Sequence, residues 1–150
     1  MENTALIGIA GVHHVVSELS RRGLVALPTT KNIAAYDIVA LNVQGTKHAN
    51  IQVKASSKRV GFFPMPPAEK VRAGKYDIYV FVRWLPREGH YECFLLTGRQ
   101  ARDAVAGEIE SQRISIAAGT RKVEFPCVAV GPKNAQAAER WRRAWLKWNL

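Results

Sequence analysis

Three polar side chains suited to cation binding and proton transfer lie in two neighbouring apolar segments. Asp37 belongs to the segment 36–43, and Gln52 and Lys54 belong to the alternating segment 49–55. Such alternation is typical of a half-buried strand, on which successive side chains point to opposite faces. Gln52 and Lys54 are therefore expected on one face of a strand, with Asp37 on the strand beside it.

The residues between the two segments predict how these strands pair. A two-residue type II′ turn requires glycine at its first central position, so the sequence Gln44-Gly45-Thr46-Lys47 predicts a hairpin that turns on Gly45-Thr46. Paired positions then sum to about 91, which puts Asp37 opposite Lys54 and diagonal to Gln52. A register error of two residues keeps the three side chains on one face, whereas an error of one residue does not.

A carboxylate, an amide oxygen and an ammonium group on one patch of sheet can bind a hard cation and act on its bound water. Mg²⁺ prefers oxygen ligands and keeps several waters, so one or two carboxylates suffice. Bound water has a lowered pKa and can attack a phosphodiester, while Lys54 would orient the water and stabilise developing negative charge. Glu18 is a candidate third ligand. From spacing alone, an Asp37–Lys54 ion pair on a solvated face is the alternative.

Hydrophobic periodicity and turn signals predict the elements that hold these residues. Apolar residues at helical spacing predict a helix over 5–22, and the β-branched and aromatic run 77–85 is the strongest strand signal. Further elements are expected as strands at 24–27, 91–96 and 123–130, a helix capped by Thr97 that ends near 106, and a final helix at 134–148. This order predicts a single α/β or α+β domain over residues 1–150.

The final helix carries three tryptophans. Trp141, Trp145 and Trp148 are spaced so that they form a stripe along one helix face. We expect this stripe to dock on the core of the domain. A homodimer interface and direct contact with nucleic acid are the alternatives.

Positive charge exceeds negative charge over the chain as a whole, but it is not spread evenly. Lys and Arg number 22 against 12 Asp and Glu, a net charge of +10, which favours a polyanionic partner such as nucleic acid. Between residues 54 and 75, six basic residues stand against Glu69 alone. Those that follow Lys54 are candidates for contacts with phosphates: Lys58, Arg59, Lys70, Arg72 and Lys75. A solvated loop is the alternative reading of this stretch.

Composition excludes several other classes of protein. Hydrophobic residues make up 47% of the chain, which is enough for a core and excludes wholesale disorder. Cys93 and Cys127 cannot build a disulfide framework or a four-ligand zinc site. No basic leader and no apolar run of the roughly eighteen residues needed for a membrane span occurs, so we expect no membrane partner and a cytoplasmic location.

Glu18, Asp37 and the run Gln52-Val53-Lys54, in this order around a glycine-turned hairpin, resemble the motif of the PD-(D/E)XK nuclease superfamily. The segments GVHHVVSELSRRG, YDIVA and IQVKASS resemble its first helix and its two metal-site strands. The segments DIYVFV and YECFLLT resemble the later strands of small stand-alone bacterial members. The resemblance covers residues 5–106 and implies an α/β fold with a restriction-endonuclease-like core, in which helices flank a mixed central β-sheet.

The resemblance also implies a role for each matching residue. Asp37 would be the central metal ligand, Gln52 a second ligand through its side-chain oxygen, and Val53 a third through its carbonyl. Lys54 would be the catalytic lysine, and Glu18 would contact the metal from the first helix. Gln52 departs from the Asp or Glu of most members, which removes one negative charge and weakens metal affinity. Glutamine also occurs here in some methylation-dependent restriction nucleases that resemble this domain.

The expected function is therefore cleavage of phosphodiester bonds in nucleic acid, with DNA as the substrate and Mg²⁺ or Mn²⁺ as the cofactor. Two alternatives stay open. One is a catalytically silent relative that binds nucleic acid, and the other is an accessory subunit of a defence or repair complex.

Overall fold

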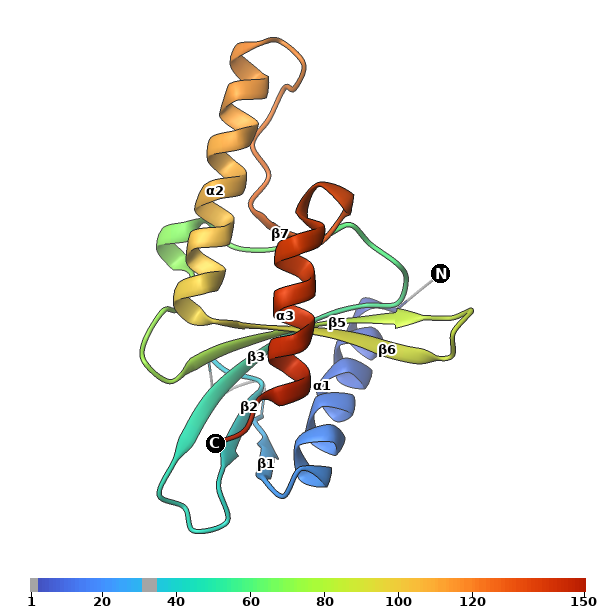
Figure 1. Ribbon diagram of the computed structural model, residues 1–150, viewed down its shortest axis with the longest axis vertical. Helices are drawn as coiled ribbons and strands as arrows, with labels where there is room; N and C mark the ends of the chain where they lie inside the picture. Colours follow the sequence, from blue (N-terminus) through green and yellow to red (C-terminus); the bar gives the residue numbers. More distant parts are fainter. Residues whose placement is uncertain (1–2, 31–34) are drawn as a thin grey trace.

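A mixed β-sheet forms the centre of the computed structural model, which describes residues 3–30 and 35–150 (Figure 1). The elements of these residues are, in chain order, α1 (Thr4–Arg21), β1 (Val25–Pro28), β2 (Ile38–Leu41), β3 (His48–Ser56), β4 (Phe62–Pro64), the 3₁₀ helix η1 (Ala68–Lys70), β5 (Asp77–Leu85), β6 (His90–Thr97), α2 (Gly98–Ala117), β7 (Cys127–Ala129), the 3₁₀ helix η2 (Pro132–Asn134) and α3 (Ala135–Lys147). None of the helices in the described ranges has the length and apolar character needed to cross a membrane.

The central sheet has the strand order β1-β2-β3-β5-β6. β3 and β5 are parallel, and the other neighbours are antiparallel. The parallel pair requires a crossover, and residues 57–76 provide it, with β4 and η1 on the way. The predicted fold class, α/β with a mixed central sheet flanked by helices, is confirmed.

Helix α1 covers one face of the sheet. Asn3 caps it by accepting hydrogen bonds from the backbone N–H groups of the first turn. Val15 and Leu19 are fully buried in a core with Ile51 of β3. Gly11 permits a close approach, because a Cβ atom at this position would lie 2.6 Å from the Cβ of Ala55. The helix is therefore fixed along β3, on the face to which Ile51 points.

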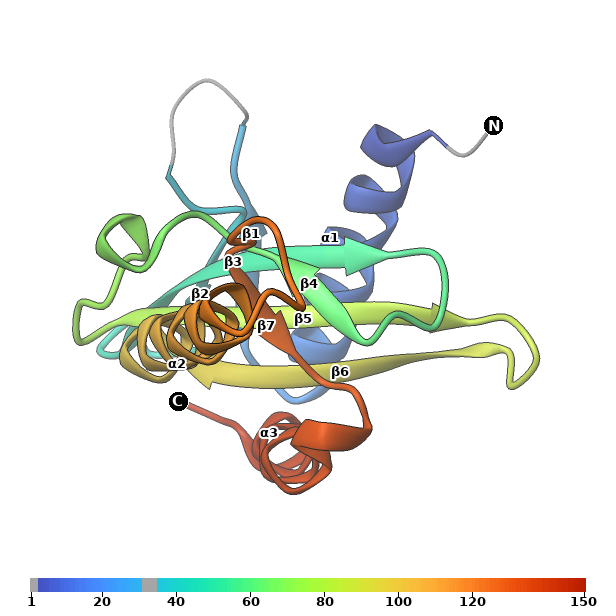
Figure 2. The same ribbon diagram turned by 90° about the horizontal axis from the view of Figure 1, so that it is seen from above.

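The opposite face of the sheet is covered by α2 and by the two-stranded ribbon β4–β7 (Figure 2). Phe63 of the ribbon packs against Phe81 and Phe94 of the sheet. Thr97 and Gln100 form a capping box at the start of α2, as the sequence indicated for Thr97. The helix does not end near 106, because Gly107 does not interrupt it, and it projects beyond the sheet in Figure 1.

Helix α3 crosses β6 at the edge of the sheet (Figures 1 and 2). Trp145 is 5% exposed, and Trp148 packs against the same core. Trp141 packs against the core on the other face. The tryptophan stripe docks on the protein's own core, as predicted.

The hairpin between β2 and β3 differs from the predicted one. The last pair is Leu41 with His48, so paired positions sum to 89 rather than 91. The Asn42 side chain explains the wider loop: its Oδ1 accepts the N–H of Lys47 at 2.9 Å. This local bond closes a longer turn, in which Gly45 adopts a φ of +68°. The predicted two-residue turn was wrong, and the register moved by two.

Candidate active site

Asp37 lies directly before β2, beside the middle of β3. Its backbone N–H donates to the carbonyl of Ile51 at 2.9 Å. Ile51 is also the register partner of Ile38, so Asp37 and Ile38 both lie beside this one residue of β3. The Asp37 Oδ2 atom accepts a hydrogen bond from the backbone N–H of Val53 at 2.7 Å. This charge-assisted bond holds the carboxylate against the backbone of β3.

Gln52 and Lys54 lie on the face of β3 that is turned away from α1. Their parallel register partners, Tyr79 and Phe81, belong to the core under α2, whereas Ile51 belongs to the core under α1. Both side chains are half-buried, and neither makes a hydrogen bond or an ion pair with any other described residue. Their polar groups are therefore available to a ligand.

The backbone of Val53 adds a further oxygen. A strand residue directs its N–H and its C=O to the same edge, so the Val53 carbonyl points to the edge where its N–H meets Asp37. β2 begins only at Ile38, opposite Ile51, and does not reach this carbonyl. The Asp37 carboxylate, the Gln52 amide and the Val53 carbonyl thus come from one short stretch of the sheet.

The alternative reading of Asp37 and Lys54 as an ion pair is not found. No ion pair joins these two side chains among the residues that the structure describes, and the carboxylate is bonded to the Val53 backbone instead. The register shift of two residues explains why the ion pair is absent. When paired positions sum to 89, the register places Asp37 opposite Gln52 and not opposite Lys54.

Glu18 is not brought to this group. It lies on α1, on the opposite face of the sheet from Gln52 and Lys54. Its carboxylate is 3.3 Å from Arg21 and faces a cavity of about 440 Å³ that Tyr91 and Trp145 also line. The spacing of Glu18 from the buried Val15 and Leu19 turns it toward β6 and α3.

The available oxygens fit a weakly held hard cation. Among residues 3–30 and 35–150, no three His, Cys, Asp or Glu side chains gather where they could hold a metal. Asp37, Gln52 and the Val53 carbonyl supply only oxygen donors and a single negative charge. This chemistry suits Mg²⁺, which prefers oxygen and retains much of its water.

The predicted phosphate contacts are divided between the two ends of β3. Lys58 and Arg59 follow its C-terminal end, where Arg59 is 2.6 Å from Glu88 in an exposed ion pair. Lys70 lies in η1, and Arg72 and Lys75 follow it in the crossover. The second group approaches the start of β5, which lies beside Asn50 of β3.

Two tyrosines that sequence reasoning missed are neighbours of Asp37 and Gln52, one along the chain and one across the sheet. Tyr36 precedes Asp37, and its ring lies 4.5 Å from the guanidinium carbon of Arg72. Tyr79 is the register partner of Gln52, and its hydroxyl oxygen accepts the backbone N–H of Arg72 at 3.2 Å. Burial raises the pKa of Tyr79. No local pattern marks these residues, because only the β3–β5 register and the crossover path bring them together.

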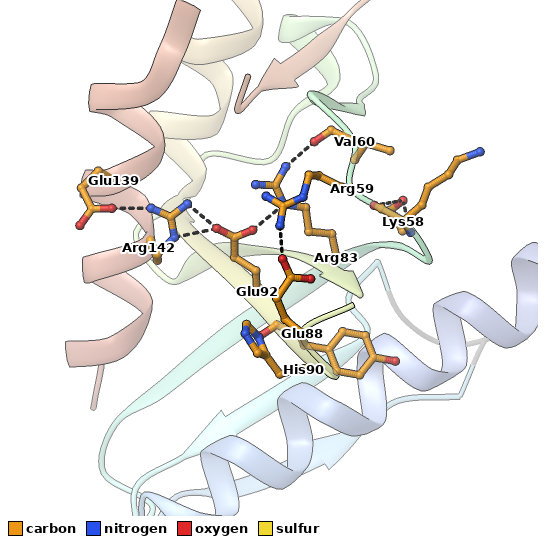
Figure 3. Close-up of polar contacts among 11 residues, drawn as sticks. Lys58, Arg59, Val60, Arg83, Glu88, His90, Glu92, Glu139 and Arg142 are labelled. Carbon is orange, nitrogen blue, oxygen red and sulfur yellow. Dashed lines mark hydrogen bonds and ion pairs between the residues drawn. The ribbon is translucent and has the colours of Figure 1, made fainter. Parts of the chain in front are cut away.

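A separate polar cluster joins the sheet to α3 (Figure 3). Glu92 of β6 accepts hydrogen bonds from Arg83 at 2.6 Å and from the Nε atom of Arg142 at 2.8 Å. Arg142 also pairs with Glu139. Arg83 and Arg142 each lie 5.2 Å from the ring of Phe94. Every charge in this network has a partner, including those of the buried Arg83 and of Glu92, so the network needs no ligand.

A larger groove lies elsewhere. It has a volume of about 1150 Å³, with the outer side of β7 as part of its lining and with α2 and the start of α3 on its flanks. Phe62 and Phe125 meet edge to face in its lining, 5.5 Å apart. The lining includes none of Asp37, Gln52 and Lys54, so the groove is separate from the candidate active site.

Comparisons with known proteins give one likeness. No family model and no curated protein matches the chain. The structure is similar to that of a bacterial homing endonuclease, with 17% sequence identity and a TM-score of 0.46 over 66% of this chain and 68% of that chain. At this level the likeness says nothing about activity, and the function below is argued from this chain's own residues.

Proposed function

We propose that this protein is a metal-dependent nuclease of the PD-(D/E)XK type that hydrolyses phosphodiester bonds, with DNA as its substrate. The observation that carries the proposal is the convergence of Asp37, Gln52 and the Val53 carbonyl beside Lys54, whose side chain has no partner among the described residues. Half-buried polar groups that the fold itself does not use are candidates for binding and catalysis.

Each residue has a separate task in this proposal. Asp37, Gln52 and the Val53 carbonyl would hold Mg²⁺ or Mn²⁺, and the Val53 N–H keeps the carboxylate in place by its bond to Oδ2. A divalent cation at this place would supply a water of lowered pKa and would neutralise phosphate charge. Lys54 places its ammonium group beside the reacting phosphate and stabilises the negative charge that develops there.

The net charge of +10 supports a polyanionic substrate. Lys58 and Lys70 would contact phosphates on the two sides of Lys54, since they lie on the two halves of the crossover. Arg59 contributes less to such contacts because its guanidinium is already paired with Glu88.

Cleavage of supercoiled plasmid DNA with Mg²⁺ and with Mn²⁺ tests the proposal. We expect Lys54→Ala to reduce the cleavage rate by about 100-fold or more, as for other groups that stabilise developing charge. DNA affinity should fall far less than the rate. Lys47→Ala removes an exposed lysine from the β2–β3 turn and is the matched control. Equal rates for Lys54→Ala and Lys47→Ala would refute the assignment.

One observation favours a second function, a catalytically silent nucleic-acid-binding protein. Glu18 lies on the other face of the sheet, and Gln52 carries no charge, so Asp37 is the single carboxylate of the donor set. In that case the wild-type protein binds DNA at low salt and cleaves with neither metal. Failure to bind DNA or RNA would instead favour an accessory subunit of a larger complex.

A further inference from the structure

Arg72 differs from the other basic residues of the crossover because its backbone is held rigidly. Its N–H donates to the hydroxyl oxygen of the buried Tyr79 at 3.2 Å, and the carbonyl of the preceding Val71 accepts a hydrogen bond from Arg102 at 2.6 Å. Gly98 packs so closely that a Cβ there would lie 2.4 Å from the Arg72 carbonyl oxygen. The Cα of Arg72 is therefore fixed relative to β5 and the start of α2.

The side chain of Arg72 is held as well, by Tyr36. The guanidinium lies over the ring, 4.5 Å from its centroid, and the terminal nitrogen Nη2 donates to the tyrosine hydroxyl. Tyr36 is in turn anchored, because its carbonyl accepts a hydrogen bond from the Thr29 hydroxyl. An exposed arginine normally loses considerable rotamer entropy when it binds a ligand. Here the fold has already removed much of that freedom.

The neighbouring cations lack this combination. Lys58 and Lys70 make no side-chain hydrogen bond or ion pair within the described residues, and Arg59 is committed to Glu88. Lys75 lies over Tyr76 at 5.4 Å, but an ammonium group cannot form the two-pronged contact that a guanidinium makes with phosphate. Arg72 is also tied to the neighbours of two candidate site residues: Tyr36 directly precedes Asp37 in the chain, and Tyr79 is the register partner of Gln52.

We propose that Tyr36 is a positioning residue that presents Arg72 to a phosphate group of the bound nucleic acid. This inference rests on the proposed function and names the substrate contact beside its site. One N–H of Nη2 and one flat face of the guanidinium are used by the hydroxyl and the ring of Tyr36. The second N–H of Nη2 makes no hydrogen bond with a described residue, and together with Nε or Nη1 it is left for the two-pronged contact with phosphate. The gain is preorganisation, because the cation does not have to be ordered when the phosphate arrives.

Equilibrium binding of a fluorescent DNA duplex in EDTA tests the inference without requiring cleavage. We expect Tyr36→Leu, which leaves the Arg72 charge intact, to weaken binding by about 5-fold, close to the effect of Arg72→Lys. Tyr36→Phe keeps the ring and should lose about 2-fold. Combining Tyr36→Leu with Arg72→Gln should weaken binding no further than Arg72→Gln alone, because both act through one contact.

The matched control is Tyr76→Leu, which removes the tyrosine beneath Lys75 in the same crossover. Its DNA affinity should change by less than about 2-fold, because an ammonium group on a flexible stem gains little from an ordered ring. A purely structural role of Tyr36 would displace Asp37 and lower kcat without changing affinity in EDTA. The proposed role raises the dissociation constant and KM and leaves kcat nearly unchanged.

The outcomes separate the two proposals. If the wild-type protein binds and cleaves DNA but Tyr36→Leu binds as tightly as wild type, the positioning role is overturned and the nuclease proposal stands. If wild type binds DNA without cleaving it and Tyr36→Leu still weakens binding, the positioning role holds and the nuclease proposal fails. If wild type does not bind DNA or RNA at low salt, both proposals fail.

Discussion

Two polar clusters of this protein stand on the same sheet and are built in opposite ways. In the network between the sheet and α3, Glu92 accepts from both Arg83 and Arg142, and the Arg83 side chain is only 7% exposed. In the candidate active site, Asp37 bonds to a backbone N–H, while Gln52 and Lys54 have no partner among the described residues. The first cluster is complete, and the second has polar groups left over.

This difference indicates what each cluster is for. Buried charges are tolerated when every one is paired and hydrogen-bonded, so the network around Glu92 serves to fix α3 on the sheet. Polar groups that the fold leaves half-buried and unpaired gain nothing for stability. A ligand is therefore the simplest reason for Gln52 and Lys54 to share a face beside Asp37. Mutations in the two clusters are therefore expected to affect different properties.

The largest expected effect is on stability, in the complete cluster. Glu92→Ala leaves the guanidinium of Arg83 buried without its carboxylate and should lower the free energy of unfolding by about 3–5 kcal/mol. Denaturant titration followed by tryptophan fluorescence measures this. Glu139→Ala is the control, because that carboxylate is 45% exposed and solvent screens its ion pairs, so its loss should change the free energy of unfolding much less. Equal effects of the two variants would contradict the assignment of Glu92 as the centre of the network.

Much of the fold was predictable because the relevant signals are local. Most residues of the run Asp77–Leu85 are β-branched or aromatic, and its strand has the predicted bounds. The cap at Thr97 and the tryptophan stripe of α3 were also read correctly. These features depend on residues close in sequence, so propensity and periodicity were sufficient to find them.

The candidate site was only partly predictable, because it depends on register and on which face each helix covers. Asn42 closes the β2–β3 turn through its side chain, and the register shifts by two positions. Because strand faces alternate, an even shift kept Asp37 on the same face as Gln52 and Lys54. Glu18 was grouped with them from sequence order, which carries no information about the side of the sheet. Tyr36 lies beside Arg72 through a long-range contact that no local pattern signals.

A variant of the candidate active site is expected to gain function. Gln52→Glu adds a second carboxylate beside Asp37, so we expect the cation concentration for half-maximal cleavage to fall by about 10-fold. Titration of cleavage against Mg²⁺ measures it. Gln44→Glu, on the exposed turn of the same hairpin, is the control for added charge. An unchanged Mg²⁺ requirement for Gln52→Glu would place the cation away from Gln52.

Acid should weaken the complete cluster. Burial alone would raise the pKa of Glu92, but the hydrogen bonds from Arg83 and Arg142 outweigh it and hold the pKa below its usual value of 4.5. The ionised carboxylate therefore stabilises the fold above about pH 4.5, and this stability is lost as the pH falls through the lower, folded-state pKa. Unfolding measured between pH 6 and pH 2, as a rough range, should show a shallower acid loss in Glu92→Gln than in Glu139→Gln.

The smallest expected effect comes from His14, which lies beside the complete cluster, with its ring centroid 4.4 Å from that of Tyr91 and the two rings tilted. Burial lowers its pKa below 6.5, against the opposing effect of Glu18 and with a smaller contribution from Arg22. The unfolded chain thus binds the proton more readily, and stability falls as the pH drops below about 6.5.

His14→Gln should remove this loss, whereas His13→Gln, on the exposed side of α1, should keep it. Thermal unfolding at two pH values on either side of 6.5 measures the difference. If both variants kept the wild-type pH dependence, His14 would not be the titrating group.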